Sequence, residues 1–296
     1  GGEQVTTIYV FKQDATVYAH WTSASGTGWR YDEGTRTLYI LGSGPMEEYN
    51  VTTTSDGLVT NAPWGKYASQ MRTLIIADGI TETGHCSFWG CSGLTSVTIP
   101  NSVTRIAYGT FQGCDRLTSI AIPDKVTSIG AYAFDGCSGL KNIDIPEGVT
   151  EIGVLTFRGC TGLTNVTIPD SVTTISVDAF LNCSGLKSVT VPTGITRIGA
   201  EAFYGCTSLT DVYFRGTESQ WNNLRSNIEE KNESLLNATI HCTDGDITPG
   251  GETSGVTWSY DSATKTLYIK GSGPMEDYAS DNSSSANLIR PWKEYV

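Results

Sequence analysis

Apolar residues recur with a period of 23 positions over the middle of the chain. Each unit carries a Leu, then branched aliphatic residues at alternating positions, then Pro, and later Val, Ile, Phe and Cys. A fixed period of this length is the sequence signature of a stacked repeat architecture. The period is kept without an insertion by Phe88, Phe111, Phe134, Phe157, Phe180 and Phe203.

Within the unit, the pattern L-x-x-V-x-I predicts a short strand, which ends at the Pro because Pro cannot donate a ladder hydrogen bond. The apolar positions after the Pro predict a return through a turn and an irregular or helical arc. One unit buries too little apolar surface to offset the entropy of ordering its residues, so stacking on neighbours must supply the remaining stability. We therefore predict a β-rich (α/β) solenoid with parallel strands about 4.8 Å apart.

The array is predicted to cover residues 71–214 with seven strands. Met71, Leu74 and Ile76 fit the period one unit before the first close copy, but Thr83 stands where later units have Ile. A terminal repeat of a stack is expected to be atypical in this way.

The period ends after Phe214, and a different pattern follows. Thr217 and Gln220 form a capping-box pattern that opens a short helix, and ATIHC at 238–242 predicts a last strand. We predict that residues 215–242 form a C-terminal cap, and that the Gly-, Pro- and Thr-rich segment 243–254 is a linker.

A second kind of repeat flanks the array. Residues 28–49 and 257–278 are near-duplicates, and each contains W-x-Y, a turn and T-L-Y-I, which predict a β-hairpin. A Pro-Trp pair follows each copy, at Pro63–Trp64 and Pro291–Trp292. The resulting boundaries are 1–23 for the end of a preceding β module, 24–70 for an N-terminal cap, and 255–296 for a second cap that starts another array of a longer protein.

The formal net charge is −12, with 31 acidic and 19 basic residues. Nucleic acid and anionic membrane surfaces both require clustered Lys and Arg, and no cluster along the chain offsets the acidic average. No run is long enough to span a membrane or resembles a signal peptide. We expect no nucleic-acid partner and no membrane insertion, and the charge favours cationic partners.

The repeated cysteine has four possible roles: metal ligand, disulfide partner, nucleophile or small apolar filling. Zinc needs converging ligands, whereas stacked positions form a row. A rung spacing of about 4.8 Å lies within the Cα range of a disulfide, but parallel side chains keep the Cβ atoms farther apart than the preferred ~3.8 Å. Buried free thiols are favoured, with pairing of some rungs as the main alternative, and no cofactor or metal is expected. The row is Cys91, Cys114, Cys137, Cys160, Cys183 and Cys206.

Two other groups of residues could carry chemistry. His85–Cys86 and His241–Cys242 are adjacent pairs, and on an extended strand neighbours point to opposite faces, so neither pair forms a catalytic dyad. The aromatic residues of the first cap form either a sugar-stacking platform or the core of a small β unit, and we favour the core. They are Trp29, Tyr31, Tyr39, Tyr49, Trp64 and Tyr67.

The outward positions that flank the central aliphatic residue of each strand are predicted to line a concave face. They are small and polar, with no Arg and one aromatic residue near the end, which indicates a weak or broad protein-binding face or a merely solvated one. The residues are Ser96, Thr98, Ser119, Asn142, Asp144, Asn165, Thr167, Ser188, Thr190, Asp211 and Tyr213.

The 23-residue unit, with its "IP" strand end and its "AF.GC..L" return, resembles the BspA-type bacterial leucine-rich repeat over residues 71–214. The segments "GTESQW" and "LLNATIHC" resemble the usual end of such arrays, and "TLYI.GSGPM" resembles the segment that often precedes them. "DATVYAHWT" at 14–22 resembles the last strand of an internalin-type B-repeat. His85–Cys86 and Asp115–Arg116 depart from the family pattern without threatening the fold.

The resemblance implies a right-handed leucine-rich-repeat-type stack in a secreted or cell-wall-associated bacterial protein. It further implies protein–protein binding or adhesion to a host or neighbouring-cell surface protein, with no enzymatic activity, and we expect a monomer. Two alternatives stay open: a carbohydrate-binding module that uses the aromatic residues of the cap, and a non-binding structural spacer in a larger surface protein.

Overall fold

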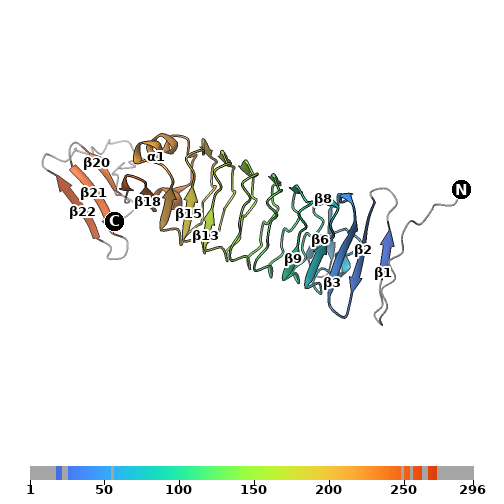
Figure 1. The fold of residues 1–296 in the computed structure, drawn as a ribbon. Coiled ribbons are helices and arrows are strands. Elements are labelled where there is room, and N and C mark those ends of the chain that lie inside the picture. The colour runs from blue at the N-terminus through green and yellow to red at the C-terminus, as the bar shows by residue number, and fades with distance from the viewer. Residues whose placement is uncertain are drawn as a thin grey trace, which may run out of the picture.

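The computed structural model describes residues 18–21, 26–54, 57–247, 250–253, 256–261 and 266–271. Most of them form an elongated stack of rungs, and residues 250–253, 256–261 and 266–271 form a separate antiparallel sheet (Figure 1). The strands within the stack run parallel and pair with copies one period away. The predicted β-rich solenoid is therefore confirmed.

The L-x-x-V-x-I segments form the main ladder. β7 (Thr73–Ile76) pairs in register with β9 (Ser96–Thr98). Further along, β13 (Asn165–Thr167), β15 (Ser188–Val191) and β17 (Asp211–Phe214) pair in the same way. Stacking thus places equivalent residues of each unit side by side on one face, called the strand face below.

The prediction of seven strands is wrong for two rungs. The segments that contain Ile120 and Ile143 hold their place in the stack without forming regular strands, apart from one bridge between Asp144 and Thr167. Both carry Ile at the central inward position, where the other close copies have Val. The interruption of the ladder therefore coincides with the change from Val to Ile.

The return path is also more regular than predicted. In place of an irregular or helical arc, the return path forms short strands that pair in parallel in two separate sheets. In each unit after a Pro, the Ile of the V-x-x-I segment is buried and the preceding residue lies nearer the surface, as period-2 alternation requires. The strands of the return path are β8 (Ile80–Glu82), β10 (Arg105–Ile106), β11 (Ser128–Ile129), β12 (Glu151–Ile152), β14 (Thr174–Ile175) and β16 (Arg197–Ile198).

The repeated Phe forms the spine of the core. Phe134 and Phe157 stack with ring centroids 5.6 Å apart and planes only 4° from parallel, and the other neighbouring pairs of the series have centroids 5.2 or 5.6 Å apart. Trp64 of the N-terminal cap continues the column, with its ring centroid 5.8 Å from that of Phe88. The cap therefore covers the apolar end of the stack with a ring of its own.

The N-terminal cap contains the predicted hairpin, formed by β2 (Thr27–Asp32) and β3 (Thr37–Gly42). β3 pairs in parallel with β7, so the cap extends the main ladder. β1 (Tyr18–Trp21), which lies in the segment predicted to end a preceding module, pairs with β2. The remaining elements are β4 (Gly44–Pro45), β5 (Val51–Thr54), β6 (Gly57–Thr60) and the 3-10 helix Gly65–Tyr67.

The C-terminal cap begins with α1 (Glu218–Arg225), and the predicted capping box between Thr217 and Gln220 is present. A short helix α2 (Glu233–Leu236) leads into β18 (Thr239–Cys242), which adds a last parallel strand to β17. The buried Asn232 closes the stack because its side chain accepts a hydrogen bond from the backbone of Phe203 and donates to the carbonyl of Gly199.

The segment 243–254 was predicted to be a linker, but it contains two strands. β19 (Gly245–Ile247) pairs antiparallel with β18, and β20 (Gly250–Thr253) pairs with β21 (Val256–Asp261). β21 and β22 (Thr266–Gly271) form the hairpin predicted for the second copy of the cap. Residues 272–296, the rest of that copy, lie outside the described residues, as does most of the predicted B-repeat segment.

Candidate functional site

The strand face brings together all eleven side chains predicted to line it. Eight are exposed, and Ser188, Thr190 and Asp211 are half-buried. Equivalent residues lie in straight columns, because the ladder pairs Asn165 with Ser188 and Thr167 with Thr190. The hydroxyl of Ser188 donates to the side-chain oxygen of Asn165 at 2.7 Å, so hydrogen bonds also connect side chains along a column.

A groove of about 500 Å³ opens in the middle of this face, where the main ladder is interrupted. Its floor includes Ile143 and Ile145, and its rim carries the carboxylates of Asp144 and Glu147. Sequence reasoning missed the groove, although Ile in place of Val at the central position was a visible signal. Its other lining residues are Asn142, Asn165, Thr167 and Pro169.

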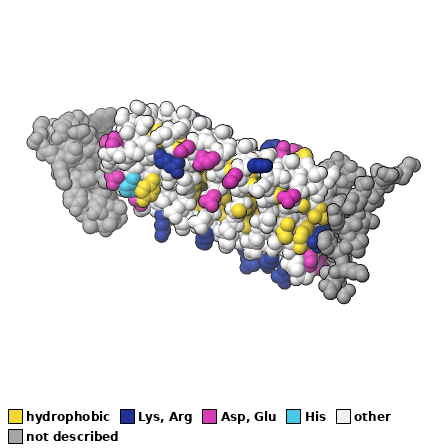
Figure 2. Space-filling view, viewed as in Figure 1, with side chains coloured by type: hydrophobic (Ala, Val, Ile, Leu, Met, Phe, Trp, Pro, Cys, Tyr) yellow, Lys and Arg dark blue, Asp and Glu magenta, His cyan; other side chains and the backbone are white. Residues whose placement is uncertain are grey.

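The face seen in Figure 2 carries most of its Asp and Glu side chains in its middle, together with some Lys and Arg. Further Lys and Arg side chains are spaced along its lower long edge. Asp144 and Glu147 belong to the groove, and Asp124 and Asp170 lie exposed one period on either side of Glu147. The centre of the face is therefore suited to cationic rather than anionic groups.

A histidine closes the C-terminal end of the strand face. The ring of His241 stacks on Tyr213 with centroids 4.7 Å apart. Its Nε2 lies 2.8 Å from Oδ1 of Asp211, and its Nδ1 lies 3.1 Å from Oδ1 of Asp246. The bond to Asp211, followed by that to Asp246, raises the pKa of His241, and the same bond to His241 lowers the pKa of Asp211.

The cap is expected to be more stable at about pH 5.5 than at about pH 8.5. The pKa of His241 is raised by folding, so its stabilising charge is fully present below the ordinary histidine pKa and is lost as pH rises through the folded value. Because the pKa of Asp211 is lowered, its contribution is lost only at more acidic pH. The pair is partly solvated, so the change is at most about 1 kcal/mol. Denaturant unfolding at both pH values tests this, and an equal pH dependence in His241→Gln would contradict it.

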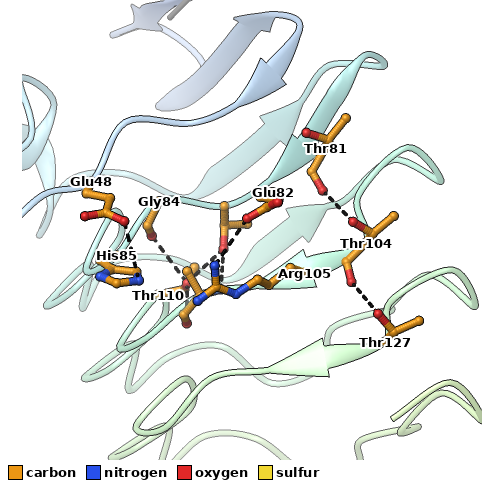
Figure 3. Close-up of polar contacts among 11 residues, drawn as sticks. Glu48, Thr81, Glu82, Gly84, His85, Thr104, Arg105, Thr110 and Thr127 are labelled. Atoms are coloured by element: carbon orange, nitrogen blue, oxygen red, sulfur yellow. Dashed lines mark hydrogen bonds and ion pairs between the residues drawn. The ribbon is translucent and has the colours of Figure 1, made fainter.

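The two His-Cys pairs do not form catalytic dyads. His241 and Cys242 lie on β18 as expected, but His85 and Cys86 do not lie on a strand. They occupy a turn in which Cys86 has a φ of 49°, so the prediction of an extended strand at this pair was wrong. The imidazole of His85 instead lies 3.8 Å from the carboxylate of Glu48 (Figure 3). No hydrogen bond joins His85 to Cys86 in the described part of the chain.

The six stacked cysteines are buried, and none is in a disulfide. From the second rung on, each thiol donates to the backbone carbonyl of the Phe 26 positions earlier, as Cys137 does to Phe111 at 3.1 Å and Cys183 to Phe157 at 3.0 Å. Burial raises the pKa of Cys91 to about 12 and also raises that of Cys137. Because the thiolate is the reactive form, such thiols are chemically inert at neutral pH.

Thiol titration tests the oxidation state of this row. The native protein is expected to react slowly at the six buried positions, because burial disfavours the thiolate and blocks the reagent. After denaturation without reductant, six or more of the eight cysteines should react. A count near zero in the denatured, unreduced protein would show that the row is paired in disulfides.

The aromatic residues of the first cap form its core. Trp29, Tyr31, Trp64 and Tyr67 are at most 8% exposed, and Tyr39 is half-buried, as is Tyr49. Tyr31 stacks on Tyr67 at 4.1 Å, and the indole nitrogen of Trp64 donates to the carbonyl of Ser87 at 2.7 Å. Rings packed in this way present no open platform for a sugar, so the structure contradicts the carbohydrate-binding alternative at this site.

The described residues contain no group of three or more His, Cys, Asp or Glu side chains placed to hold a metal ion. Nor do they include a helix with the length and apolar character needed to cross a bilayer.

The chain is a capped solenoid of parallel 23-residue rungs, with Phe and Cys stacked at equivalent positions. These features place it in the class of leucine-rich repeat proteins. The chain belongs to the family described as "BspA type Leucine rich repeat region", whose sequence profile matches six copies over residues 66–183 and 127–243. No curated protein matches the chain.

Solved structures with a related fold come from several bacteria. A leucine-rich repeat protein of T. pallidum is 22% identical over 70% of this chain and 97% of its own, with a TM-score of 0.48. One from Bacteroides ovatus is 22% identical over 71% of this chain and 66% of its own, with a TM-score of 0.41. A leucine-rich cell surface protein of Faecalibacterium prausnitzii is 18% identical over 70% and 97%, with a TM-score of 0.36.

Proposed function

We propose that the chain is part of an extracellular bacterial surface protein that binds a protein on a host or neighbouring cell through its strand face. The observation that carries this proposal is the continuity of the face. Stacking assembles short polar side chains from successive rungs into one exposed surface, with a groove at its centre. Repeat solenoids bind partners on extended surfaces of this kind.

The composition of the face suggests the kind of partner. Its hydroxyl and amide groups supply hydrogen bonds, and Tyr213 is its one large aromatic side chain, 47% exposed. Since binding hot spots are enriched in Trp, Tyr and Arg, we expect contact spread over many rungs rather than one dominant anchor. The carboxylates of Asp144 and Glu147 at the groove favour a partner with a Lys or Arg side chain at that point.

The test uses two double variants that add the same charge at different positions. Asn142→Arg with Thr167→Arg places two long cations in the groove, whereas Ser138→Arg with Thr161→Arg places them on exposed turns after the cysteines. Both are screened with the wild type on an array of secreted and cell-surface proteins. We expect wild-type signals that the groove variant loses and the turn variant keeps. Equal loss, or no wild-type signal, would contradict the proposal, and the latter would favour a structural spacer.

A further inference from the structure

A column of residues runs along one edge of the strand face. In the repeats, each of its residues directly follows the Leu position of its unit. The backbone N–H of Thr95 donates to Arg72, that of Lys187 to Thr164, and that of Thr210 to Lys187, at 2.8–3.0 Å. Arg36 of the cap begins the column, because its carbonyl accepts from the N–H of Arg72. In chain order the column is Arg36, Arg72, Thr95, Thr118, Lys141, Thr164, Lys187 and Thr210.

Five cations lie on or beside this column, and we call them the basic edge. Four belong to the column itself, and Arg116 lies two positions before Thr118, at one of the departures from the family pattern. Successive members are 36, 44, 25 and 46 positions apart, so only stacking brings them into line. Figure 2 shows such Lys and Arg side chains spaced along the lower edge of the molecule. The basic edge is Arg36, Arg72, Arg116, Lys141 and Lys187.

The basic edge gathers cations without a carboxylate partner into a row, whereas Lys125 and Arg225, which also lack one among the described residues, lie apart from it. Five cations elsewhere each contact a carboxylate at 3.3 Å or less, as Arg105 contacts Glu82 in Figure 3. Within the described chain no carboxylate lies within ion-pair distance of the basic edge, and Arg72 donates only to backbone carbonyls. In a protein of net charge −12, unpaired cations in a row are available for an anion from outside.

The shape of the basic edge selects a thin, linear ligand. Arg72 and Lys187 are five rungs apart, which corresponds to roughly 24 Å at a rung spacing of about 4.8 Å. The row is one residue wide, and the carboxylates of Asp144 and Glu147 lie on the adjoining face. A flat bilayer or a nucleic-acid duplex would bring its anions over those carboxylates, whereas a single chain along the edge would not.

The residues between the cations favour a sugar polymer. The column has no aromatic side chain on which bases could stack, as single-stranded nucleic acid requires. The hydroxyl of Thr95 already donates to the carbonyl of Arg72. That of Thr210 donates to the carboxylate of Asp211 at 2.7 Å or to the carbonyl of Lys187 at 3.4 Å, so both hydroxyl oxygens stay available as acceptors. Sugar hydroxyls can donate to these oxygens. We propose that the basic edge binds a linear anionic polysaccharide, whose acidic groups pair with the Lys and Arg side chains.

Heparin, a sulfated polysaccharide, is the probe. Lys141→Glu with Lys187→Glu reverses two charges of the basic edge, and Lys125→Glu with Arg225→Glu makes the same charge change at two exposed cations elsewhere. At about 50 mM salt we expect wild type and the Lys125/Arg225 variant to be retained on immobilised heparin and released at about 200 mM. The Lys141/Lys187 variant should bind about tenfold more weakly or worse. Unchanged thermal unfolding shows that each variant is folded, and Lys141→Gln with Lys187→Gln should be intermediate.

The outcomes separate this proposal from general charge effects. Loss of retention in both double variants, or retention of both, would overturn the assignment to the basic edge. Failure of the wild type to bind heparin would overturn the assignment of an anionic polysaccharide as the ligand. Equally tight binding to single-stranded DNA or to vesicles with anionic lipid would show attraction without selection for a sugar polymer, and would also overturn it. None of these results bears on a protein partner at the groove.

Discussion

Replacing Phe157 by Ala is expected to lower the free energy of unfolding by about 3–5 kcal/mol. The ring is fully buried and stacks on both sides, with centroids 5.6 Å from Phe134 and 5.2 Å from Phe180. Truncation removes the transfer free energy of the ring and leaves a cavity between two rungs. The rungs cannot close over it, because their backbone ladders fix the spacing.

The loss of stability should depend on where in the Phe column the ring is removed. Each repeat contacts only its neighbours, so Phe157→Ala weakens two interfaces, whereas Phe203→Ala at the end of the series loses one ring neighbour. Tyr204, which is 48% exposed, supplies the control, and Tyr204→Ala should change stability by about 0.5 kcal/mol or less. Denaturant unfolding measures all three. A Phe157→Ala variant no less stable than Tyr204→Ala would show that the Phe column is not what holds the rungs together.

The sequence predicts the stack well because its signals are local and repeated. The outward positions alternate with buried aliphatic residues, so the exposure of Ser96 and Thr98 follows from strand periodicity alone. The capping box at Thr217 was visible for the same reason, since both partners lie within four residues. Each of these features depends on one unit and its immediate neighbours.

The features that were missed depend on contacts between rungs. The ladder is interrupted at the rungs of Ile120 and Ile143, and a groove lies beside the second of them, which the alternation within one unit does not predict. The bonds of His241 to Asp211 and Asp246 join three residues of the cap and the last repeat. The basic edge is not visible in the sequence because its members are far apart in the chain, although Asp115–Arg116 departs from the family pattern at one of them.

A buried ion pair between rungs carries the second large expected effect. The carboxylate of Asp135 is 3% exposed and accepts two hydrogen bonds from the guanidinium of Arg158, from Nε at 2.7 Å and Nη2 at 2.6 Å. Gln112 donates a third, at 2.7 Å. Burial raises the pKa of Asp135, and the hydrogen bonds and charge of Arg158 oppose the shift, so Arg158 favours the charged form of the carboxyl group.

Arg158→Ala is expected to destabilise the protein by about 2–4 kcal/mol near neutral pH, because it leaves the carboxylate of Asp135 without its cation. The expected loss of stability is smaller than for a fully buried ion pair, because the Arg158 side chain is 40% exposed and water can enter the vacated site. Asp135→Asn leaves a half-solvated guanidinium and should cost less, and Asp135→Asn combined with Arg158→Ala should recover part of the loss. Arg105→Ala, which breaks an exposed pair with Glu82, should cost about 1 kcal/mol or less.

The pH dependence separates a lost charge partner from lost packing. A carboxyl group whose pKa is raised by folding binds more protons when folded, so its unfavourable contribution shrinks as pH falls through the folded pKa. Without Arg158 the pKa of Asp135 should rise further, and the stability difference between Arg158→Ala and wild type should narrow toward acidic pH. Unfolding by denaturant across the acidic range measures this difference. A constant gap at every pH would mean that Arg158 acts through its packing on Tyr132, whose ring centroid lies 5.8 Å from the guanidinium carbon, and not through its charge.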